Sequence, residues 1–263
     1  MRTALTIAGS DSGGGAGIQA DLKTFAAHGV FGTSAITALT AQNTVGVMGV
    51  HVIPPEFVDR QIEAVVADIG CDAVKTGMLA TAGIVETVAA AVARLALPNL
   101  VVDPVMVAKS GDHLLAPEAV DAVRRALLPQ ARVVTPNVPE AEVLSGLSIR
   151  TLEDAVAAGR AIQALGARAV IVKGGHLLRD DIVDVLVEGD TVVRIEGPRV
   201  PGVHTHGTGC TFAAATAARL ALGDGLEQAA RAAQAYVREA MRAGVPLGAG
   251  HRPLDHQWES RRT

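Results

Sequence analysis

Three polar residues stand directly after short apolar stretches that have the composition of buried strands. They are Asp103, Asn137 and Lys173, and each lies beside a proline or a glycine. In an open parallel sheet, ligands bind in the crevice beyond the carboxyl ends of the strands. An acid, an amide and a cation delivered to that edge therefore predict a polar, charged ligand. Asp-Pro and Lys-Gly-Gly also end strands as ordinary turns, so one of them alone would indicate little, whereas the three together favour a site.

A second candidate is the segment His206-Gly207-Thr208-Gly209-Cys210-Thr211, which opens a long alanine-rich stretch typical of a helix. Two glycines let the backbone fold tightly, so that successive N–H groups can point at one spot facing the positive end of the helix. Such a nest suits a phosphoryl group whose negative charge grows during transfer. The alternative is a plain loop in which Thr208 is a helix N-cap, and the short motif alone does not decide between the two.

Two common phosphate-binding motifs are excluded by spacing. A P-loop needs G-x-x-x-x-G-K-[ST], but in Lys109-Ser110-Gly111 the order is reversed. A dinucleotide fingerprint needs G-x-G-x-x-G, and no register of the Gly13–Gly17 stretch satisfies it. A NAD-dependent oxidoreductase is thereby disfavoured. The Gly13–Gly17 stretch still follows a predicted strand and precedes a predicted helix, so we expect it to shape a loop that faces the ligand.

Short apolar runs alternate along the chain with longer amphipathic ones, as in an α/β fold whose mostly parallel sheet is covered by helices on both faces. We expect a three-layer αβα sandwich. The predicted strands are Ala4–Ala8, Gly49–Ile53, Ala73–Lys75, Leu100–Asp103, Val133–Thr135, Ala169–Lys173, Ile182–Glu188 and Thr191–Ile195.

The predicted helices carry clear start and stop signals. Pro55 begins a helix that ends at Ile69 before Gly70, and Thr151 begins one with a capping box that Gly166 closes. Two alanine-rich helices, Thr208–Leu222 and Gly225–Met241, are separated by a Gly-Asp-Gly turn. The stripe of the first helix that should be buried consists of Phe57, Val58, Ile62, Val65, Val66 and Ile69.

Composition narrows the partners and the compartment. The 263 residues carry a net charge of -4 with scattered basic residues, which argues against nucleic acid and anionic membranes. The two cysteines, Cys71 and Cys210, lie far apart, so we expect no disulfide framework, no thiolate metal site and a cytoplasmic location. No apolar stretch reaches the ~18 residues of a membrane span. Without a linker or a shift in composition, we expect one domain over residues 1–263, with a disordered tail at 259–263.

At Ser10–Asp21 the chain resembles the hydroxymethylpyrimidine/phosphomethylpyrimidine kinases, a branch of the ribokinase-like superfamily. The resemblance implies a ribokinase-like fold, ATP and Mg²⁺ as cofactors, and a homodimer. It implies phosphorylation of 4-amino-5-hydroxymethyl-2-methylpyrimidine (HMP) and then of HMP phosphate, in thiamine biosynthesis. The segments that match, in the family's order, are Ser10–Asp21, Thr40–Thr44, Lys75–Leu79, Val102–Met106, Ala108–Asp112, Thr135–Glu142, Val172–His176 and Thr205–Thr211.

Roles can be carried over to the matching residues of this chain. On the substrate side, the resemblance implies that Gln42 holds the aminopyrimidine ring, that Asp21 and the backbone of Gly9 lie beside the same pocket, and that Met78 and Val105 form apolar walls. Gln42 suits this role because its amide offers both an acceptor and donors. A buried amide that stabilises a loop is the alternative.

On the nucleotide side, the resemblance implies that Lys173, Asn137, Thr208 and Gly209 meet the phosphates. Glu140 and Asp103 would hold Mg²⁺ largely through water, which agrees with the preference of this ion for oxygen ligands and retained waters.

Gly207, Gly209 and Cys210 would form an anion hole, with Cys210 where related enzymes carry an aspartate base. A helix N-terminus lowers the pKa of a thiol, so we expect some thiolate at neutral pH. Whether Cys210 acts as a base or only shapes the hole stays open. The loops Gly13–Gly17 and Ala108–Asp112 would exclude water, and Lys109 is a candidate for holding the monophosphate.

Two rival functions remain. A pyridoxal kinase would share the fold, but relatives with that main activity tend to lack the pair seen here at Gln42-Asn43. A catalytically silent vitamin-binding module is disfavoured because Lys173, Asn137, Glu140 and the anion-hole glycines are all present.

Overall fold

The protein is built around a mixed nine-stranded sheet with helices on both faces. The computed structural model describes residues 1–106, 117–176, 181–202 and 204–261. The strand order is β3-β2-β1-β4-β5-β6-β7-β8-β9, with parallel pairing from β2 through β7 and antiparallel pairing of β3, β8 and β9 at the two edges. The strands are β1 (Thr3–Asp11), β2 (Phe31–Gln42), β3 (Val47–Val52), β4 (Ala73–Thr76), β5 (Leu100–Val102), β6 (Val133–Val134), β7 (Ala169–Val172), β8 (Asp181–Glu188) and β9 (Thr191–Pro198).

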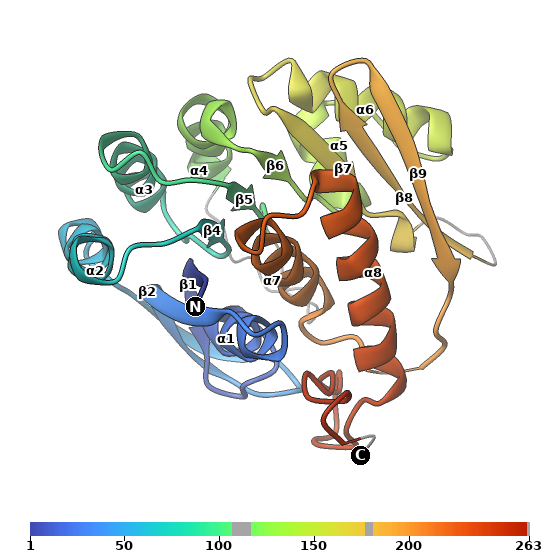
Figure 1. Cartoon of the computed structure of the whole chain (residues 1–263), viewed down its shortest axis with the longest axis horizontal. Coiled ribbons are helices and arrows are strands. Elements are labelled where there is room, and N and C mark those ends of the chain that lie inside the picture. Colours follow the sequence, from blue (N-terminus) through green and yellow to red (C-terminus); the bar gives the residue numbers. More distant parts are fainter. Residues whose placement is uncertain (107–116, 177–180, 203, 262–263) are drawn as a thin grey trace.

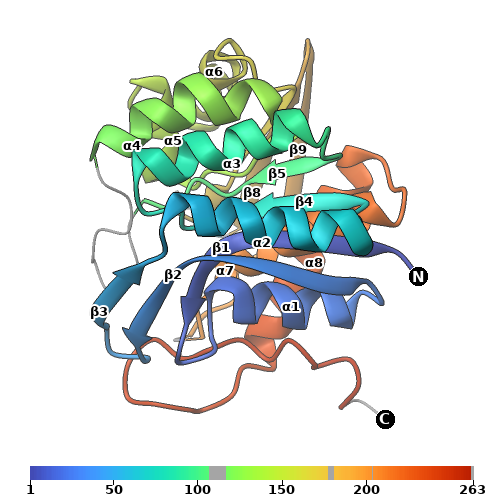
Figure 2. The same cartoon turned by 90° about the vertical axis from the view of Figure 1, so that its left-hand side faces the viewer.

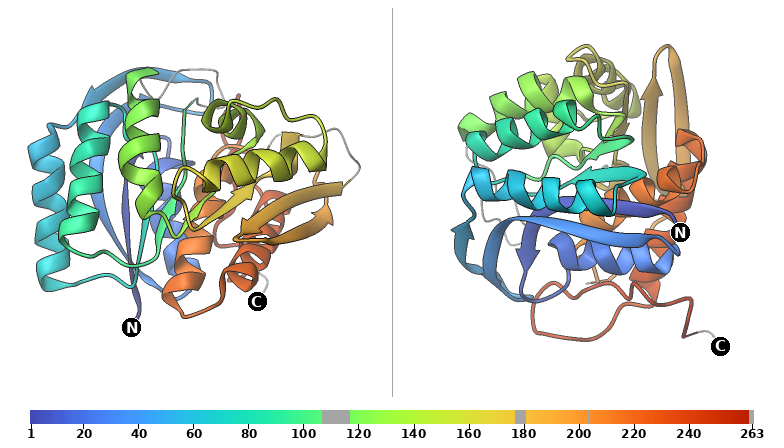
Figure 3. Two further views of the ribbon diagram at one scale, coloured as in Figure 1. Left: turned by 90° about the horizontal axis from the view of Figure 1, so that it is seen from above. Right: turned by 60° about the vertical axis from the view of Figure 1, so that its left-hand side comes forward.

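Helices form the two outer layers, which confirms the expected αβα sandwich. On one face lie α2 (Pro55–Asp68), α3 (Ala82–Arg94), α4 (Pro117–Ala122), α5 (Val138–Ser145) and α6 (Leu152–Gln163). On the other lie α1 (Gly17–Ala27), α7 (Thr208–Ala221) and α8 (Leu226–Arg242). Figure 1 and Figure 2 show this division, and α2, α3 and α4 run side by side in the left panel of Figure 3.

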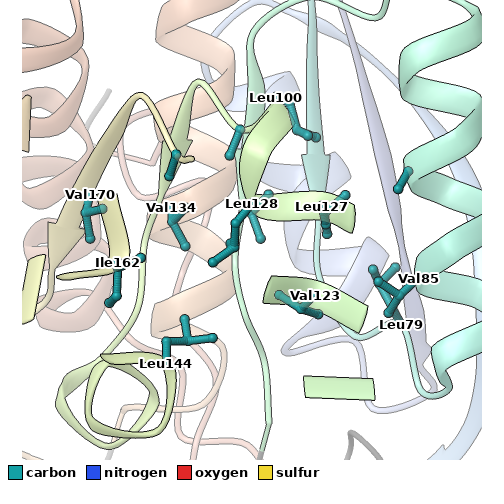
Figure 4. Close-up of a cluster of buried hydrophobic side chains, with 14 of the residues drawn as sticks. Leu79, Val85, Leu100, Val123, Leu127, Leu128, Val134, Leu144, Ile162 and Val170 are labelled. Carbon is teal, nitrogen blue, oxygen red and sulfur yellow. The ribbon is translucent and has the colours of Figure 1, made fainter. Parts of the chain in front are cut away.

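The sheet separates two hydrophobic cores, and the side chains of its central strands alternate between them. Val134 and Val172 face the α2–α6 layer, whereas their neighbours Val133 and Ile171 face α1, α7 and α8. This period of two is what a strand that is buried on both faces requires. Figure 4 shows the first core, in which Leu127 and Leu128 pack between α3 and the sheet.

Most of the predicted elements are present, with boundaries shifted by a few residues. Helix α2 begins at Pro55, and α6 has the predicted capping box at Thr151 and Asp154 but ends at Gln163, before Gly166. The predicted buried stripe of α2 is wrong at its two ends, because Phe57 is 54% exposed and Ile69 is 45% exposed. Phe57 lies on a different face of α2 from the fully buried Val58, and Ile69 follows the last helical residue, Asp68.

The strand β2 was not predicted. Its sequence, FGTSAITALTAQ, consists mainly of small and hydroxyl-bearing residues and lacks the aliphatic run of a typical buried strand. Small residues are needed here because α1 packs closely on this strand: a Cβ at Gly32 would lie 2.8 Å from the Leu22 side chain and 3.0 Å from Phe25.

The carboxyl-terminal segment is tied to the rest of the chain by hydrogen bonds. Residues 259–261 form turns, and the Arg261 guanidinium lies 3.3 Å from Asp255. The preceding segment runs past the end of the β2–β3 hairpin and below α1, as Figure 2 shows. It is anchored by His256, whose Nε2 forms a hydrogen bond with Thr211 Oγ1 at 3.0 Å, and by the Tyr236 hydroxyl, which donates to the His256 carbonyl. Among the helices that the structure describes, none combines the length and the apolar character that a bilayer crossing requires.

The buried ring of His256 predicts a specific acid sensitivity. Burial, with a smaller contribution from the charge of Lys23, lowers the pKa of His256 to about 4 from an ordinary value of 6.5. Between these two values the unfolded chain binds a proton that the folded protein does not, so stability falls as the pH decreases and is fully retained above pH 6.5. The loss amounts to about 3 kcal/mol. Urea unfolding at pH 7 and pH 4.5 should show a smaller pH-dependent loss in His256→Gln than in the wild type, and equal losses would contradict this role.

Candidate active site

A cavity of about 850 Å³ opens at the carboxyl ends of β5, β6 and β7. It is the place that the three strand-end residues predicted. The residues predicted for the site that line it are Gln42, Asp103, Val105, Asn137, Glu140, Lys173, Gly207, Thr208, Gly209 and Cys210. Segments from both halves of the chain thus meet at one edge of the sheet.

The charged centre of the cavity is formed by Lys173 and Asp103. Lys173 Nζ lies 3.2 Å from Asp103 Oδ1, with 14% and 2% of the two side chains exposed. Asn137 joins them because it forms a parallel β-bridge to Lys173, whose backbone N–H donates to the Pro136 carbonyl at 2.8 Å. Asp103 and Lys173 directly follow β5 and β7, and Asn137 comes three residues after the end of β6, so adjacent parallel strands deliver all three to one place.

Asn137 and Glu140 form a reciprocal capping box at the start of α5. The Asn137 side chain accepts from the Glu140 N–H at 2.9 Å, and Glu140 Oε2 accepts from the Asn137 N–H at 2.8 Å. The box fixes both side chains at the cavity and leaves the other carboxylate oxygen of Glu140 outside this bond.

The electrostatics of this cluster follow from two carboxylates sharing one buried cation. Burial raises the pKa of Glu140 to about 7; the Lys173 charge opposes this shift and the Asp103 charge adds to it. Burial alone would lower the pKa of Lys173, but Asp103 and Glu140 more than offset this effect and raise it. The cluster is therefore short of positive charge, which a bound cation would supply.

The same residues suit a magnesium ion. Among the residues that the structure describes, Asp103 Oδ2 is buried and has no hydrogen-bond partner, and no group of three histidine, cysteine or acidic side chains could hold a metal by itself. Mg²⁺ commonly takes one or two carboxylates and completes its shell with waters and phosphate oxygens. Asp103 and Glu140 offer carboxylate oxygens of this kind at the charged centre of the cavity.

The anion hole predicted at the start of α7 has the expected backbone. Gly207 is the N-cap at φ +83°, and the first turn of the helix begins at Thr208. Thr208 is thus not the N-cap, and its hydroxyl donates to the Thr205 carbonyl at 3.2 Å. A Cβ added to Gly209 would lie 3.4 Å from Lys173 Nζ and 3.8 Å from Asp103 Oδ2, so any side chain there would fill the space between the helix start and the charged centre. That open space, with N–H groups on one side and an ammonium on the other, suits a phosphoryl group.

The expectation of a partly ionised Cys210 is wrong. Burial raises the pKa of the Cys210 thiol to about 11; the charge of Lys75 lowers it only in part, and the charges of Asp103 and Asp21 raise it further. A pKa raised in this way favours the protonated thiol at pH 7.

Gln42 lies at the end of β2, on the opposite side of the cavity from Asn137. Ser12 Oγ both donates to the Gln42 carbonyl and accepts from the Gln42 N–H, each at 2.8 Å. Thr40 Oγ1 lies 3.1 Å from Gln42 Oε1, which orients the amide. Gln42 is therefore held by backbone and side chain and can present an amide group to a ligand.

Three residues predicted for the substrate pocket do not line the cavity. Gly9 and Met78 lie together beneath it, since a Cβ on Gly9 would be 3.0 Å from the Met78 sulfur. Asp21 is fully buried, and its carboxylate lies 2.8 Å from Lys75 Nζ and 2.6 Å from the Thr6 hydroxyl. The structure thus gives Asp21 an ion pair in the interior, near enough to the cavity for its charge to act on Cys210 and Asp103. A buried carboxylate requires such a partner.

One wall of the cavity was not foreseen. It comes from β9, the segment after it and α8, and includes Gly197, Val200, Gln234, Val237 and Met241. Nothing in the sequence marks these residues as part of a site. The amphipathic pattern of α8 is already explained by one face in the core and one face at the surface. The Ala108–Asp112 loop, with Lys109, lies outside the described residues.

The buried cation predicts a large effect of Lys173→Met on stability. The substitution leaves Asp103 and Glu140 facing each other without a compensating charge, and breaking such a pair typically costs about 3–5 kcal/mol. Arg194→Met is the matched control, because its pair with Glu153 is exposed and such pairs contribute about 0–1 kcal/mol. Urea unfolding without magnesium measures both, and similar losses for the two variants would contradict the charged centre. Added Mg²⁺ should partly restore the stability of Lys173→Met.

Comparison with known proteins agrees with this site. The chain matches the phosphomethylpyrimidine kinase family over residues 11–255. It is 50% identical over 254 residues to the hydroxymethylpyrimidine/phosphomethylpyrimidine kinase of Bacillus subtilis, covering 96% of this chain and 94% of that one. It is 52% identical over 252 residues to the thiamine biosynthesis bifunctional protein ThiED of Geobacter sulfurreducens, covering 96% of this chain and 51% of that longer protein. The ADP complex of Bacillus subtilis pyridoxal kinase superposes with a TM-score of 0.92 at 41% identity, over 99% of both chains. The chain therefore belongs to the phosphomethylpyrimidine kinase family.

Proposed function

We propose that this protein transfers the γ-phosphoryl group of ATP to the hydroxymethyl group of HMP, and then a second one to HMP phosphate, in thiamine biosynthesis. The observation that carries the proposal is the position of Gly209 in the first turn of α7. Because Gly209 has no side chain, a small space stays open between the first N–H groups of this helix and the side chains of Lys173 and Asp103. Gln42 lines the same cavity. The names of the relatives support the pyrimidine as substrate.

The chain's own groups can perform the transfer by binding and orientation. Phosphoryl transfer passes through a loose transition state, so positioning and charge stabilisation supply most of the catalysis. The N–H groups at the start of α7 and the Lys173 ammonium would neutralise charge on the moving phosphoryl group, and Gln42 would hold the ring so that its hydroxymethyl oxygen faces that group. The wall from β9 and α8 would receive the nucleoside.

Magnesium and the role of Cys210 belong to the same proposal. Asp103 and Glu140 would hold Mg²⁺, which supplies positive charge beside the phosphates. Cys210, as a neutral thiol, would shape the hole. The second transfer needs no base, because a phosphate monoester is already anionic.

We further propose a single domain over residues 1–263, a cytoplasmic location and a homodimer. The two cysteines are free thiols, which fits a reducing compartment. The exposed apolar side chains of the β2–β3 hairpin, among them Leu39, Met48 and Val50, support an association between copies.

Pyridoxal is the alternative substrate, because the pyridoxal kinase structure above is so similar. An ADP-release assay should compare HMP, HMP phosphate, pyridoxal and ribose, each with and without Mg²⁺. We expect the two pyrimidines to be preferred, with no turnover of ribose and none without the ion. Gln42→Leu should lower kcat/KM for HMP by about 100-fold, since a site built for hydrogen bonds loses most when a buried polar group is unpaired, and should affect pyridoxal less. A preference of the wild type for pyridoxal would reject the pyrimidine assignment.

The neutral thiol predicts a small effect of Cys210→Ala. Loss of a general base typically costs about 10²–10⁴-fold in rate, whereas loss of a group that only shapes the hole should cost about tenfold or less. The two phosphorylations should slow to a similar extent, because both use the same hole and neither draws on the thiol as a base. Rates measured with HMP and HMP phosphate from pH 6.5 to 9 test this, and a loss above 100-fold that is confined to the first reaction would contradict it.

A further inference from the structure

Two buried side chains lie between the two glycine-rich segments, and the proposed chemistry uses neither of them. His206 Nε2 lies 2.9 Å from Asp11 Oδ2, with only 11% and 3% of the side chains exposed. Asp11 is the last residue of β1, and His206 directly precedes Gly207, the N-cap of α7. The contact therefore joins the loop after β1 to the start of the anion-hole helix, across 195 residues of sequence.

Asp11 organises the glycine-rich loop of residues 12–16. Its Oδ1 accepts from the Gly13 N–H at 2.8 Å, and its Oδ2 accepts from the N–H groups of Gly15 and Ala16 at 3.1 and 2.8 Å. Burial alone would raise the pKa of Asp11, but the hydrogen bonds from His206, Ala16 and Gly13 lower it. Both carboxylate oxygens of Asp11 thus accept hydrogen bonds, and the loop folds around this side chain.

The loop in turn holds the residue proposed to recognise the substrate. Ser12, next to Asp11, makes the two 2.8 Å hydrogen bonds to the backbone of Gln42. A Cβ on Gly13 would lie 3.2 Å from the Cα of Asn43, so the loop packs directly on this end of β2. A displacement of the loop would therefore displace Gln42.

His206 is held from the other side by the carboxyl-terminal segment. Its backbone N–H donates to the Arg252 carbonyl at 3.2 Å, and it forms a parallel bridge with Pro253. Its ring fills the space in front of Gly15, where a Cβ would collide with it. A Cβ on Gly207 would likewise collide with the Gly15 carbonyl oxygen, so the two backbones touch.

We propose that Asp11 and His206 are a positioning pair that sets the distance between Gln42 and the anion hole, and so between the substrate hydroxyl and the γ-phosphoryl group. The proposal rests on the kinase activity proposed above. Neither residue is catalytic in this account, because both act through their neighbours. A misplacement of about 1 Å in such an arrangement can cost about 100-fold in rate. A loop released from Asp11 also admits water to the phosphoryl group, so that ATP is hydrolysed without phosphorylating the substrate.

The decisive variant is His206→Leu, which removes the ring nitrogens but keeps an apolar side chain in front of Gly15. We expect kcat for HMP to fall by about 10- to 100-fold, with KM for ATP changed less than threefold. The number of ADP molecules released per HMP phosphate formed should rise from about one to at least three. His206→Gln, which can present an N–H near the position of Nε2, should restore most of the coupling between the two. Asp11→Asn should resemble His206→Leu.

Thr211→Val is the matched control, because it removes another buried hydrogen bond between the first turn of α7 and the carboxyl-terminal segment, the one to His256. It should lower the melting temperature without changing the ratio of ADP to product. A purely structural role for the pair would make all the variants equally unstable and leave the ratio at one. That result, or an equal rise in the ratio for Thr211→Val, would overturn the proposal.

Amide hydrogen exchange tests the pair independently of activity. In His206→Leu, exchange at Gly13, Gly15 and Ala16 should be at least tenfold faster than in the wild type, whereas the central strands should be unchanged. Unaltered exchange at these three amides would overturn the pair even if the enzyme assay failed. If His206→Leu does not fold, Asp11→Asn is read in the same two measurements. If the wild type releases no ADP with any substrate, the proposed kinase function is rejected. The hydrogen-exchange measurement alone then tests whether Asp11 and His206 position the loop.

Discussion

The structure depends on a cluster of charges that the fold removes from water at the end of the sheet. Asp103 and Glu140 are almost completely buried; Asp103 pairs with the ammonium of Lys173, and the charge of this ammonium also acts on Glu140. Two carboxylates and one ammonium in a poorly solvated place leave an excess of negative charge, which is costly unless a cation joins them. The same imbalance that would destabilise an empty site favours the binding of magnesium and of the phosphates that accompany it.

The parallel sheet explains how a few short strands can build such a cluster. β5, β6 and β7 contain only 3, 2 and 4 residues, and each is followed within three residues by one polar group of the site. Because parallel strands end at the same edge, residues 103, 137 and 173 meet without any long loop. The apolar faces of these strands are buried in the two cores, so the charged cluster stands on a rigid base.

Glycine performs a second structural task by letting separate backbones touch. The loop after β1 and the start of α7 are so close that no side chain fits at Gly207 or Gly15. Close contact removes water from the space between them and fixes the relative position of two segments that come from opposite ends of the chain. The ion pair of Lys75 and Asp21, fully buried below this region, adds a second fixed charge arrangement beneath the same site.

The amino-acid sequence alone determined the layered α/β fold and placed Asp103, Asn137 and Lys173 near strand ends, because each is a local signal: a hydrophobic period or a turn residue. It also marked the glycines at the start of α7, but their spacing alone did not decide between an anion hole and a plain loop. It did not reveal β2, which has small residues because α1 packs closely on it. It also did not reveal that α8 forms part of the cavity wall. Only the tertiary structure decided that Asp21 belongs to an interior ion pair, that Cys210 is a neutral thiol, and that Asp11 meets His206. These outcomes depend on burial and on contacts between distant segments, and neither can be read from the order of residues along the chain.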